Sequence, residues 1–92
     1  MSEAISRHLK IVNEKGLHAR AAAKLVEVAE GFDASAEVSL DGQSSGADSI
    51  MGLLMLAASK GTSIEVETSG PDAEALAEAL EALVANRFGE DN

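Results

Sequence analysis

The chain has no cysteine, no tryptophan and no tyrosine, and its 92 residues include only two phenylalanines and one proline. Without cysteine, disulfide bonds and thiolate metal sites are excluded, and a reducing compartment is compatible with the composition. No apolar run approaches the roughly 20 residues that a membrane-spanning helix needs. The start, Met1-Ser2-Glu3-Ala4, lacks the basic and apolar regions of a signal peptide. We therefore expect a cytoplasmic protein that does not insert into membranes.

Basic residues are also scarce: seven stand against 16 acidic residues, which gives a formal net charge of −9. This balance argues against nucleic acid as a partner, because nucleic acids select basic surfaces. The few basic residues are concentrated toward the front of the chain, at Arg7, Lys10, Lys15, Arg20 and Lys24. Such a local excess suits an anionic ligand or an acidic protein partner.

The length predicts one domain over residues 1–92, with enough chain for a single modest core. No internal repeat or low-complexity segment is evident. Only residues 89–92, Gly-Glu-Asp-Asn, resemble a frayed tail.

Hydrophobic periodicity predicts an α+β fold with the element order βαββαβα. The second and fourth predicted strands have one apolar face each, so a sheet covered on one side only is expected, a two-layer open-faced sandwich. Gly31 follows the first helix at a place where a left-handed residue often ends a helix. The expected strands cover about residues 6–12, 36–40 and 64–68 and a short segment after the Asp41-Gly42 turn, and the expected helices about residues 18–30, 49–59 and the region from Pro71-Asp72.

The most informative segment is Gly16-Leu17-His18-Ala19-Arg20, which opens an alanine-rich helical stretch. The first backbone N–H groups of a helix lack internal partners and favour anions, including phosphate. A neutral imidazole is a nucleophile, and the planar guanidinium of Arg20 suits phosphate oxygens. The combination points to a histidine that accepts a phosphoryl group, whereas the plainer interpretation of His18 is a polar surface residue. His8 lies in an alternating run, has no such surroundings, and is interpreted as a solvated strand residue.

The segment Gly16-Leu17-His18-Ala19-Arg20 resembles the active-site motif of HPr, the family of phosphocarriers of the bacterial phosphoenolpyruvate-dependent phosphotransferase system. A second block, Ser49-Ile50-Met51-Gly52-Leu53-Leu54-Met55-Leu56, resembles the regulatory-serine helix of the same family. The similarity extends from about Leu9 to Phe88. The resemblance implies the family's fold, an open-faced sandwich with three helices on one face of a four-stranded antiparallel sheet.

The resemblance implies a carrier that is itself no enzyme and needs no cofactor or metal. His18 would accept a phosphoryl group on Nδ1 (a pros-phosphohistidine) from phospho-enzyme I and pass it to an enzyme IIA-type acceptor, with Arg20 stabilising the phosphoryl oxygens. The family usually has proline after the arginine, where this chain has Ala21. Similar non-proline variants occur in HPr-like carriers of the nitrogen-related branch. A monomer is expected.

On its own spacing, Ser49 is an ordinary N-cap residue. The resemblance makes it a regulatory phosphorylation site for HPr kinase/phosphorylase, and the two roles are compatible. It also makes Leu17, Met51 and Leu54 an exposed docking patch near His18, since methionine adapts to several partners. The alternative is that the apolar residues of this helix, Ile50, Leu53, Leu54 and Leu56, all belong to the core.

Two other classes of function remain open at the level of sequence. A small-molecule-sensing βαββαβ domain would bind a ligand between helix and sheet, but it would not need His-x-Arg at a helix start. An independent hydrolase or metalloprotein is disfavoured, because His8 and His18 are too isolated for a metal site and no Ser-His-Asp arrangement follows from the spacing.

Overall fold

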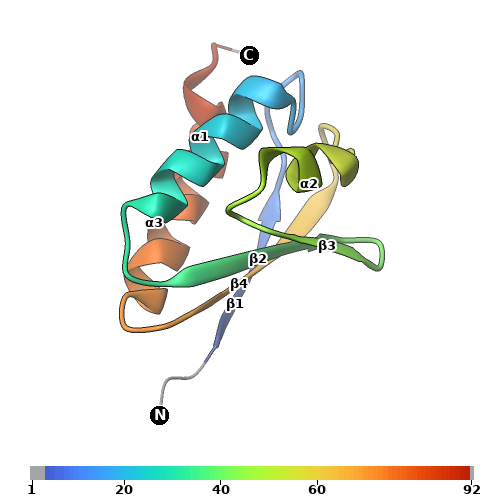
Figure 1. The fold of residues 1–92 in the computed structure, drawn as a ribbon. Coiled ribbons are helices and arrows are strands. Elements are labelled where there is room, and N and C mark those ends of the chain that lie inside the picture. Colours follow the sequence, from blue (N-terminus) through green and yellow to red (C-terminus); the bar gives the residue numbers. More distant parts are fainter. Residues whose placement is uncertain (1–3, 92) are drawn as a thin grey trace.

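The computed structural model describes residues 4–91, in which strands and helices follow one another as βαββαβα (Figure 1). The strands are β1 (Ile5–Lys10), β2 (Ser35–Leu40), β3 (Gln43–Gly46) and β4 (Ser63–Ser69). The helices are α1 (Ala19–Glu30), α2 (Ile50–Met55) and α3 (Ala73–Ala85), and a short 3₁₀ turn, η1 (Arg87–Gly89), follows α3. The predicted element order and fold class are confirmed.

The four strands form one antiparallel sheet in the order β1-β4-β2-β3. Along β4, the side chains of Ile64, Val66 and Thr68 are buried, and those of Glu65 and Glu67 are exposed. The helices lie on the face that carries the buried side chains, and the opposite face is open (Figure 1). This alternation explains the two-layer sandwich, because each strand has only one apolar face to bury.

The core lies between this sheet and the helices. Its fully buried side chains come from every layer, and the largest of them are Ile11, Leu25, Leu53, Ile64, Leu76, Leu80 and Phe88. Within residues 4–91, no helix is both long enough and apolar enough to cross a membrane.

The Asp41-Gly42 hairpin forms as predicted. Leu40 pairs directly with Gln43, so Asp41 and Gly42 alone make the connection between β2 and β3. Both residues have positive φ, 52° and 83°. Two left-handed residues in a two-residue loop are typical of the type I′ turn, whose twist matches that of the strands it joins.

Two predicted helix boundaries and one predicted backbone conformation differ from the structure. Helix α1 begins at Ala19, and His18 is its N-cap residue. Helix α2 ends at Met55 rather than near Ser59, because Ala57 adopts a left-handed conformation with φ 53° and turns the chain away. Gly31 closes α1 with φ −81°, so the left-handed residue expected there is absent.

The chain after α3 is folded back onto the domain rather than extended. Arg87, Phe88 and Gly89 all have positive φ, 55°, 54° and 80°, and they reverse the direction of the chain. Phe88 lies beyond α3 and is fully buried. The Nζ of Lys24 donates a hydrogen bond of 2.6 Å to the Phe88 carbonyl. The described part of the predicted frayed tail is therefore attached to the core, and Asn92 lies outside the described residues.

Candidate functional site

The loop before α1 fixes the position of His18. Gly16 has φ +65° and packs against the backbone of Ala58 and Ser59 so closely that a Cβ atom would not fit. The amide of Leu17 donates to the Ala58 carbonyl at 2.8 Å, and Leu17 enters the core with 3% of its surface exposed. The chain then leaves the core at His18, whose side chain is 25% exposed.

The first turn of α1 presents unpaired backbone donors beside His18. The first hydrogen bond at this end runs from the Ala22 amide to the His18 carbonyl, at 2.8 Å. Within residues 4–91, the amides of Ala19, Arg20 and Ala21 have no hydrogen-bond partner. They are the free N–H groups that an anion at a helix N-terminus requires, and Ala21 contributes one that a proline could not.

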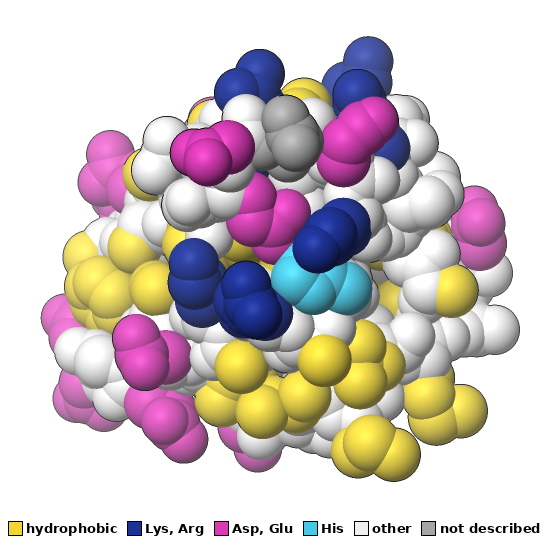
Figure 2. Space-filling view, turned by 90° about the horizontal axis from the view of Figure 1, so that it is seen from above, with side chains coloured by type: hydrophobic (Ala, Val, Ile, Leu, Met, Phe, Trp, Pro, Cys, Tyr) yellow, Lys and Arg dark blue, Asp and Glu magenta, His cyan; other side chains and the backbone are white. Residues whose placement is uncertain are grey.

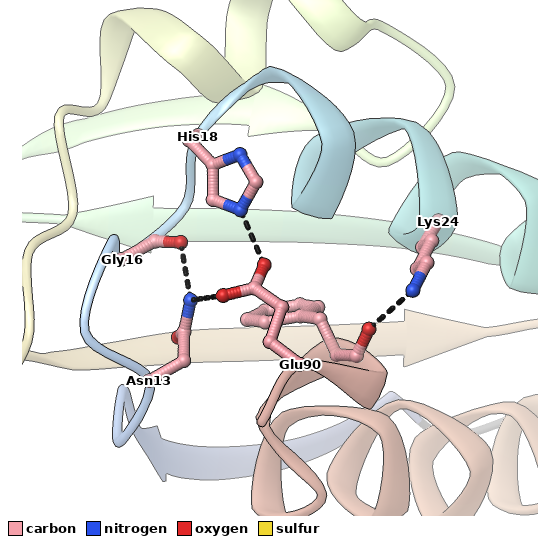
Figure 3. A network of polar contacts seen from close by, with 6 residues as sticks. Asn13, Gly16, His18, Lys24 and Glu90 are labelled. Carbon is pink, nitrogen blue, oxygen red and sulfur yellow. Dashed lines mark hydrogen bonds and ion pairs between the residues drawn. The ribbon is translucent and has the colours of Figure 1, made fainter. Parts of the chain in front are cut away.

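The side chain of Glu90 reaches His18 from the other end of the chain. One carboxylate oxygen, Oε2, contacts Nε2 of His18, and the other, Oε1, accepts a hydrogen bond of 3.1 Å from Nδ2 of Asn13 (Figure 3). Asn13 is fully buried and also donates to the Gly16 carbonyl at 2.8 Å. The carboxylate of Glu90 is thus held between the ring of His18 and the loop that positions it.

This contact determines which ring nitrogen of His18 carries a proton. The hydrogen bond from His18 holds the pKa of the Glu90 carboxyl below its ordinary value of 4.5; burial opposes this, and Asn13 and Lys15 add to it. The ionised carboxylate can only accept hydrogen bonds, so Nε2 must be the donor. In a neutral ring the lone pair then lies on Nδ1, which has no hydrogen-bond partner within residues 4–91.

A recess lined by charged side chains adjoins His18. It has a volume of about 340 Å³, and it is lined by His18 and Gly89, by the basic residues Lys15, Arg20 and Lys24, and by the acidic residues Glu14, Glu90 and Asp91. Figure 2 shows a histidine bordered by Lys and Arg side chains on the face viewed from above. Among the described residues, neither Lys15 nor Arg20 forms an ion pair, so both charges are available to an anion.

The basic region expected from the sequence is therefore smaller than predicted. Arg7 does not line the recess; it pairs with Glu81 of α3 at 2.5 Å and ties β1 to that helix. Lys10 does not line it either.

An apolar surface lies next to the recess at His18. Figure 2 shows hydrophobic side chains gathered beside the histidine, and α2, which packs against α1, carries Ile50, Met51 and Met55, exposed by 40%, 71% and 75%. Leu54 is partly buried against the core. The prediction of Leu17 as an exposed docking residue was wrong, because the turn at Gly16 directs its side chain into the core.

Ser49 is the N-cap residue of α2. Its Oγ accepts a hydrogen bond of 3.0 Å from the Gly52 amide, which satisfies one of the unpaired donors at the start of the helix. The capping role that spacing alone predicted is confirmed. The side chain is half-buried at the edge of the helix that carries the exposed methionines.

Sequence reasoning missed Asn13 and Glu90. Asn13 lies between β1 and α1, and Glu90 lies in the predicted frayed tail, and neither position carries a periodic signal. His8 is a solvated strand residue as predicted: its side chain is 74% exposed on the open face of the sheet, 3.8 Å from Glu65. Among residues 4–91, no group of three or more potential metal ligands is present.

Comparison with known proteins assigns the chain to a family. Residues 5–86 match the family model described as "PTS HPr component phosphorylation site". The phosphocarrier protein HPr of Cupriavidus necator is 48% identical over 86 residues, which covers 94% of this chain and 97% of that protein. The phosphocarrier protein NPr of Escherichia coli is 42% identical over 88 residues, covering 95% and 98%.

The crystal structure of HPr-C-His from Thermoanaerobacter tengcongensis superimposes with a TM-score of 0.90 at 35% identity, covering 96% of this chain and 99% of that one. Sequence and fold thus agree along nearly the whole chain. The chain belongs to the HPr family, the phosphocarrier proteins of the bacterial phosphotransferase system, which are carriers and not enzymes.

Proposed function

We propose that His18 is the phosphoryl acceptor of this carrier, and that Nδ1 is the atom that bonds phosphorus. The group would come from phospho-enzyme I and pass to an enzyme IIA-type acceptor. The observation that carries this proposal is the difference between the two ring nitrogens of His18: Nε2 contacts Glu90, while Nδ1 has no hydrogen-bond partner within residues 4–91.

The geometry supports a transfer that moves no proton. The Nδ1 lone pair attacks the phosphorus of the donor, the new N–P bond forms, and the donor's bond to phosphorus breaks. Nε2 keeps its proton, and the positive charge that develops on the ring faces the Glu90 carboxylate. When an acceptor attacks the phosphorus in turn, the N–P bond breaks and the ring leaves as neutral imidazole, ready for another cycle.

The phosphoryl oxygens would be held by the three free amides of α1 and by Arg20. Each charge at an exposed helix end contributes on the order of 0.3–1 kcal/mol, so the stabilisation is modest. A carrier must also release its group, and a partly exposed site with weak individual contacts suits both directions. Lys15 and Lys24 add positive charge at the recess without enclosing it.

Docking of enzyme I and of the acceptor would use the surface next to the recess. Met51 and Leu54 of α2 supply apolar contacts, and Met55 and Ile50 extend the same surface. Leu17 supports this region from within the core. An acidic partner surface would be complementary to Lys15 and Arg20, since basic and acidic patches steer association.

The protein would act as a cytoplasmic monomer made of one domain over residues 1–92. Among the described residues, the exposed large hydrophobic side chains are those of the α2 surface alone, which is reserved for the partners in this proposal. Sedimentation analysis of the purified chain should give the mass of a single copy, 9.4 kDa.

The deciding experiment is incubation with enzyme I and phosphoenolpyruvate, followed by intact mass measurement and NMR. A phosphoryl adduct that is labile in acid and attached to Nδ1 of His18 is expected. Attachment at Nε2, or no adduct, would refute the assignment. Adding enzyme IIA proteins of the sugar and nitrogen branches separately, and comparing the rates of transfer, would then identify the acceptor.

Replacing Glu90 with glutamine should slow phosphorylation of His18 by about tenfold, the effect of losing one charge-assisted hydrogen bond of modest strength.

Glu90→Gln should also change the stability of the fold in acid. A carboxyl with a lowered pKa stabilises the fold fully above its ordinary value of 4.5, and this contribution disappears as the pH falls through the lower pKa of the folded state. Denaturation at pH 7 and at pH 3 should therefore show a smaller difference for Glu90→Gln than for the parent protein.

The matched control is Glu78→Gln, which removes one negative charge from an exposed position of α3. This variant should phosphorylate like the parent and keep the parent's pH dependence. Equal behaviour of the two glutamine variants would exclude a specific role for Glu90.

Phosphorylation of Ser49 by HPr kinase/phosphorylase is proposed as a regulatory step. A phosphate would bring a charge of about −1.5 to −2 to the edge of the docking surface. Because enzyme I must approach with a phosphoryl group of its own, Ser49→Asp should lower the rate of His18 phosphorylation several-fold. Aspartate is itself a good N-cap residue, so the melting temperature should change little.

Rates for Ser49→Asp are best measured at low and at high salt, because a charge effect weakens as screening increases. Ser44→Asp adds the same charge to an exposed position of β3 and serves as the control. A Ser49→Asp rate equal to that of Ser44→Asp at low salt would leave Ser49 with its capping role alone.

A further inference from the structure

The methionines of the described chain are unusually exposed. Met51 and Met55 are exposed by 71% and 75%, and both belong to α2. They are four residues apart and so lie on the same side of the helix. The chain contains no cysteine, so these thioethers are the accessible sulfur atoms of residues 4–91.

We propose that Met51 and Met55 form an oxidation site, at which a hydroperoxide converts the thioethers to sulfoxides and thereby weakens docking of enzyme I. The inference rests on the proposed docking role of α2. It makes phosphoryl transfer through this carrier sensitive to oxidants, and it makes the effect reversible, because methionine sulfoxide can be reduced enzymatically.

The chemistry needs no group other than the thioether and the peroxide. A sulfur lone pair attacks one oxygen of the O–O bond, and that bond breaks as the S–O bond forms. The other oxygen leaves with its own hydrogen and takes up the proton that the sulfur-bound oxygen releases, so hydrogen peroxide gives a sulfoxide and one water. Sulfur is oxidised by two electrons and the peroxide is reduced by two. Exposure of both side chains allows the oxidant to approach the sulfur atoms directly.

The fold does not depend on the two thioethers. Leu53, which lies between them in sequence, is fully buried and anchors α2 to the core, and Ser49 caps the helix. A sulfoxide on an exposed side chain keeps its access to water in the free protein. In a complex, the same polar oxygen would be moved from water into an apolar contact, which is unfavourable unless the partner donates a hydrogen bond.

The test uses the full chain treated with hydrogen peroxide, which is removed before enzyme I and phosphoenolpyruvate are added. Peptide mass mapping should show one added oxygen at Met51 and at Met55. The kcat/KM of enzyme I for the treated carrier should fall by roughly tenfold, as expected when an unpaired polar group enters an interface. The circular dichroism spectrum should stay the same, and methionine sulfoxide reductase should restore the rate.

The control is the double variant Met51→Leu/Met55→Leu, compared with its own untreated sample. Met1 remains in this variant, so an effect of oxidation at Met1 would appear there. The ratio of treated to untreated rates should be close to one. Met51→Gln/Met55→Gln, which places polar groups permanently at both positions, should be slow before any treatment.

Three results would overturn the inference: no oxidation at either residue, oxidation without a change of rate, or an equal loss of rate in the leucine variant. Failure of the proposed function looks different. In that case the untreated parent protein would gain no phosphoryl group on His18 at all.

Discussion

Replacing His18 with alanine is expected to abolish phosphoryl transfer from enzyme I, with no detectable acid-labile adduct, while the protein remains folded. The imidazole supplies the nucleophilic nitrogen, and alanine has no atom that can replace it. The fold should tolerate the change because the His18 side chain is partly exposed and makes no capping hydrogen bond to α1. Intact mass after incubation with enzyme I and phosphoenolpyruvate measures the first effect, and thermal unfolding measures the second.

His8→Ala is the matched control, since it removes the same side chain from the open face of the sheet. It should be phosphorylated at the rate of the parent protein. An acid-labile adduct on His18→Ala, or its absence from His8→Ala, would show that His18 is not the phosphoryl acceptor.

Gly16→Ala should lower the melting temperature by about 15 °C. A left-handed conformation costs a residue with a Cβ about 1–2 kcal/mol, and forced overpacking costs about 1–3 kcal/mol more. Gly16 meets both conditions, because it has φ +65° and its backbone lies against Ala58 and Ser59. A loss of about 3 kcal/mol shifts the melting temperature of a domain of this size by roughly 4–8 °C per kcal/mol. Thermal unfolding followed by circular dichroism measures the shift.

Gly42→Ala separates the two causes. Gly42 has φ +83°, but no atom lies within 4 Å of the position that a Cβ would occupy. This variant should show only the conformational cost and lose about 5 °C. If both variants melted at the same temperature, the close approach of the Gly16 loop to the Ala58 backbone would add nothing to the loss of stability in Gly16→Ala. A loss of phosphorylation at 20 °C in folded Gly16→Ala would further show that the loop positions His18.

The sequence was sufficient for the fold because local patterns and global packing agree. Alternation in β4 defines one buried face, and the Asp41-Gly42 pair specifies a tight hairpin, so the sheet follows from signals a few residues long. The end of α2 did not follow from such signals. Ala57 has a left-handed conformation that alanine rarely adopts, so the residue type gives no signal that the helix ends there.

The proposed nucleophile His18 and its basic neighbour Arg20 could also be predicted from the sequence, because they are close in sequence and lie at a helix start. The residues that orient the His18 ring could not be predicted in this way. Asn13 and Glu90 meet His18 through the three-dimensional fold, and an acidic residue near the end of an acidic chain looks like a solvated one. The prediction for Leu17 failed for a related reason: its amide bonds to the carbonyl of the distant Ala58, and this contact, which the motif does not reveal, fixes the turn that directs the side chain into the core.

The site joins two parts of the chain that are synthesised at different times. His18 and Glu90 are 72 positions apart, and Asn13 and Glu90 are 77 positions apart. Since chains emerge from the ribosome N-terminal part first, His18 is present long before its carboxylate partner. A product released before Phe88 would lack a fully buried core side chain, whose removal costs about 3–5 kcal/mol, together with the carboxylate that holds the ring. A chain that ends before Phe88 is thus expected to be less stable and slower to accept a phosphoryl group, because Phe88 and Glu90 are lost together.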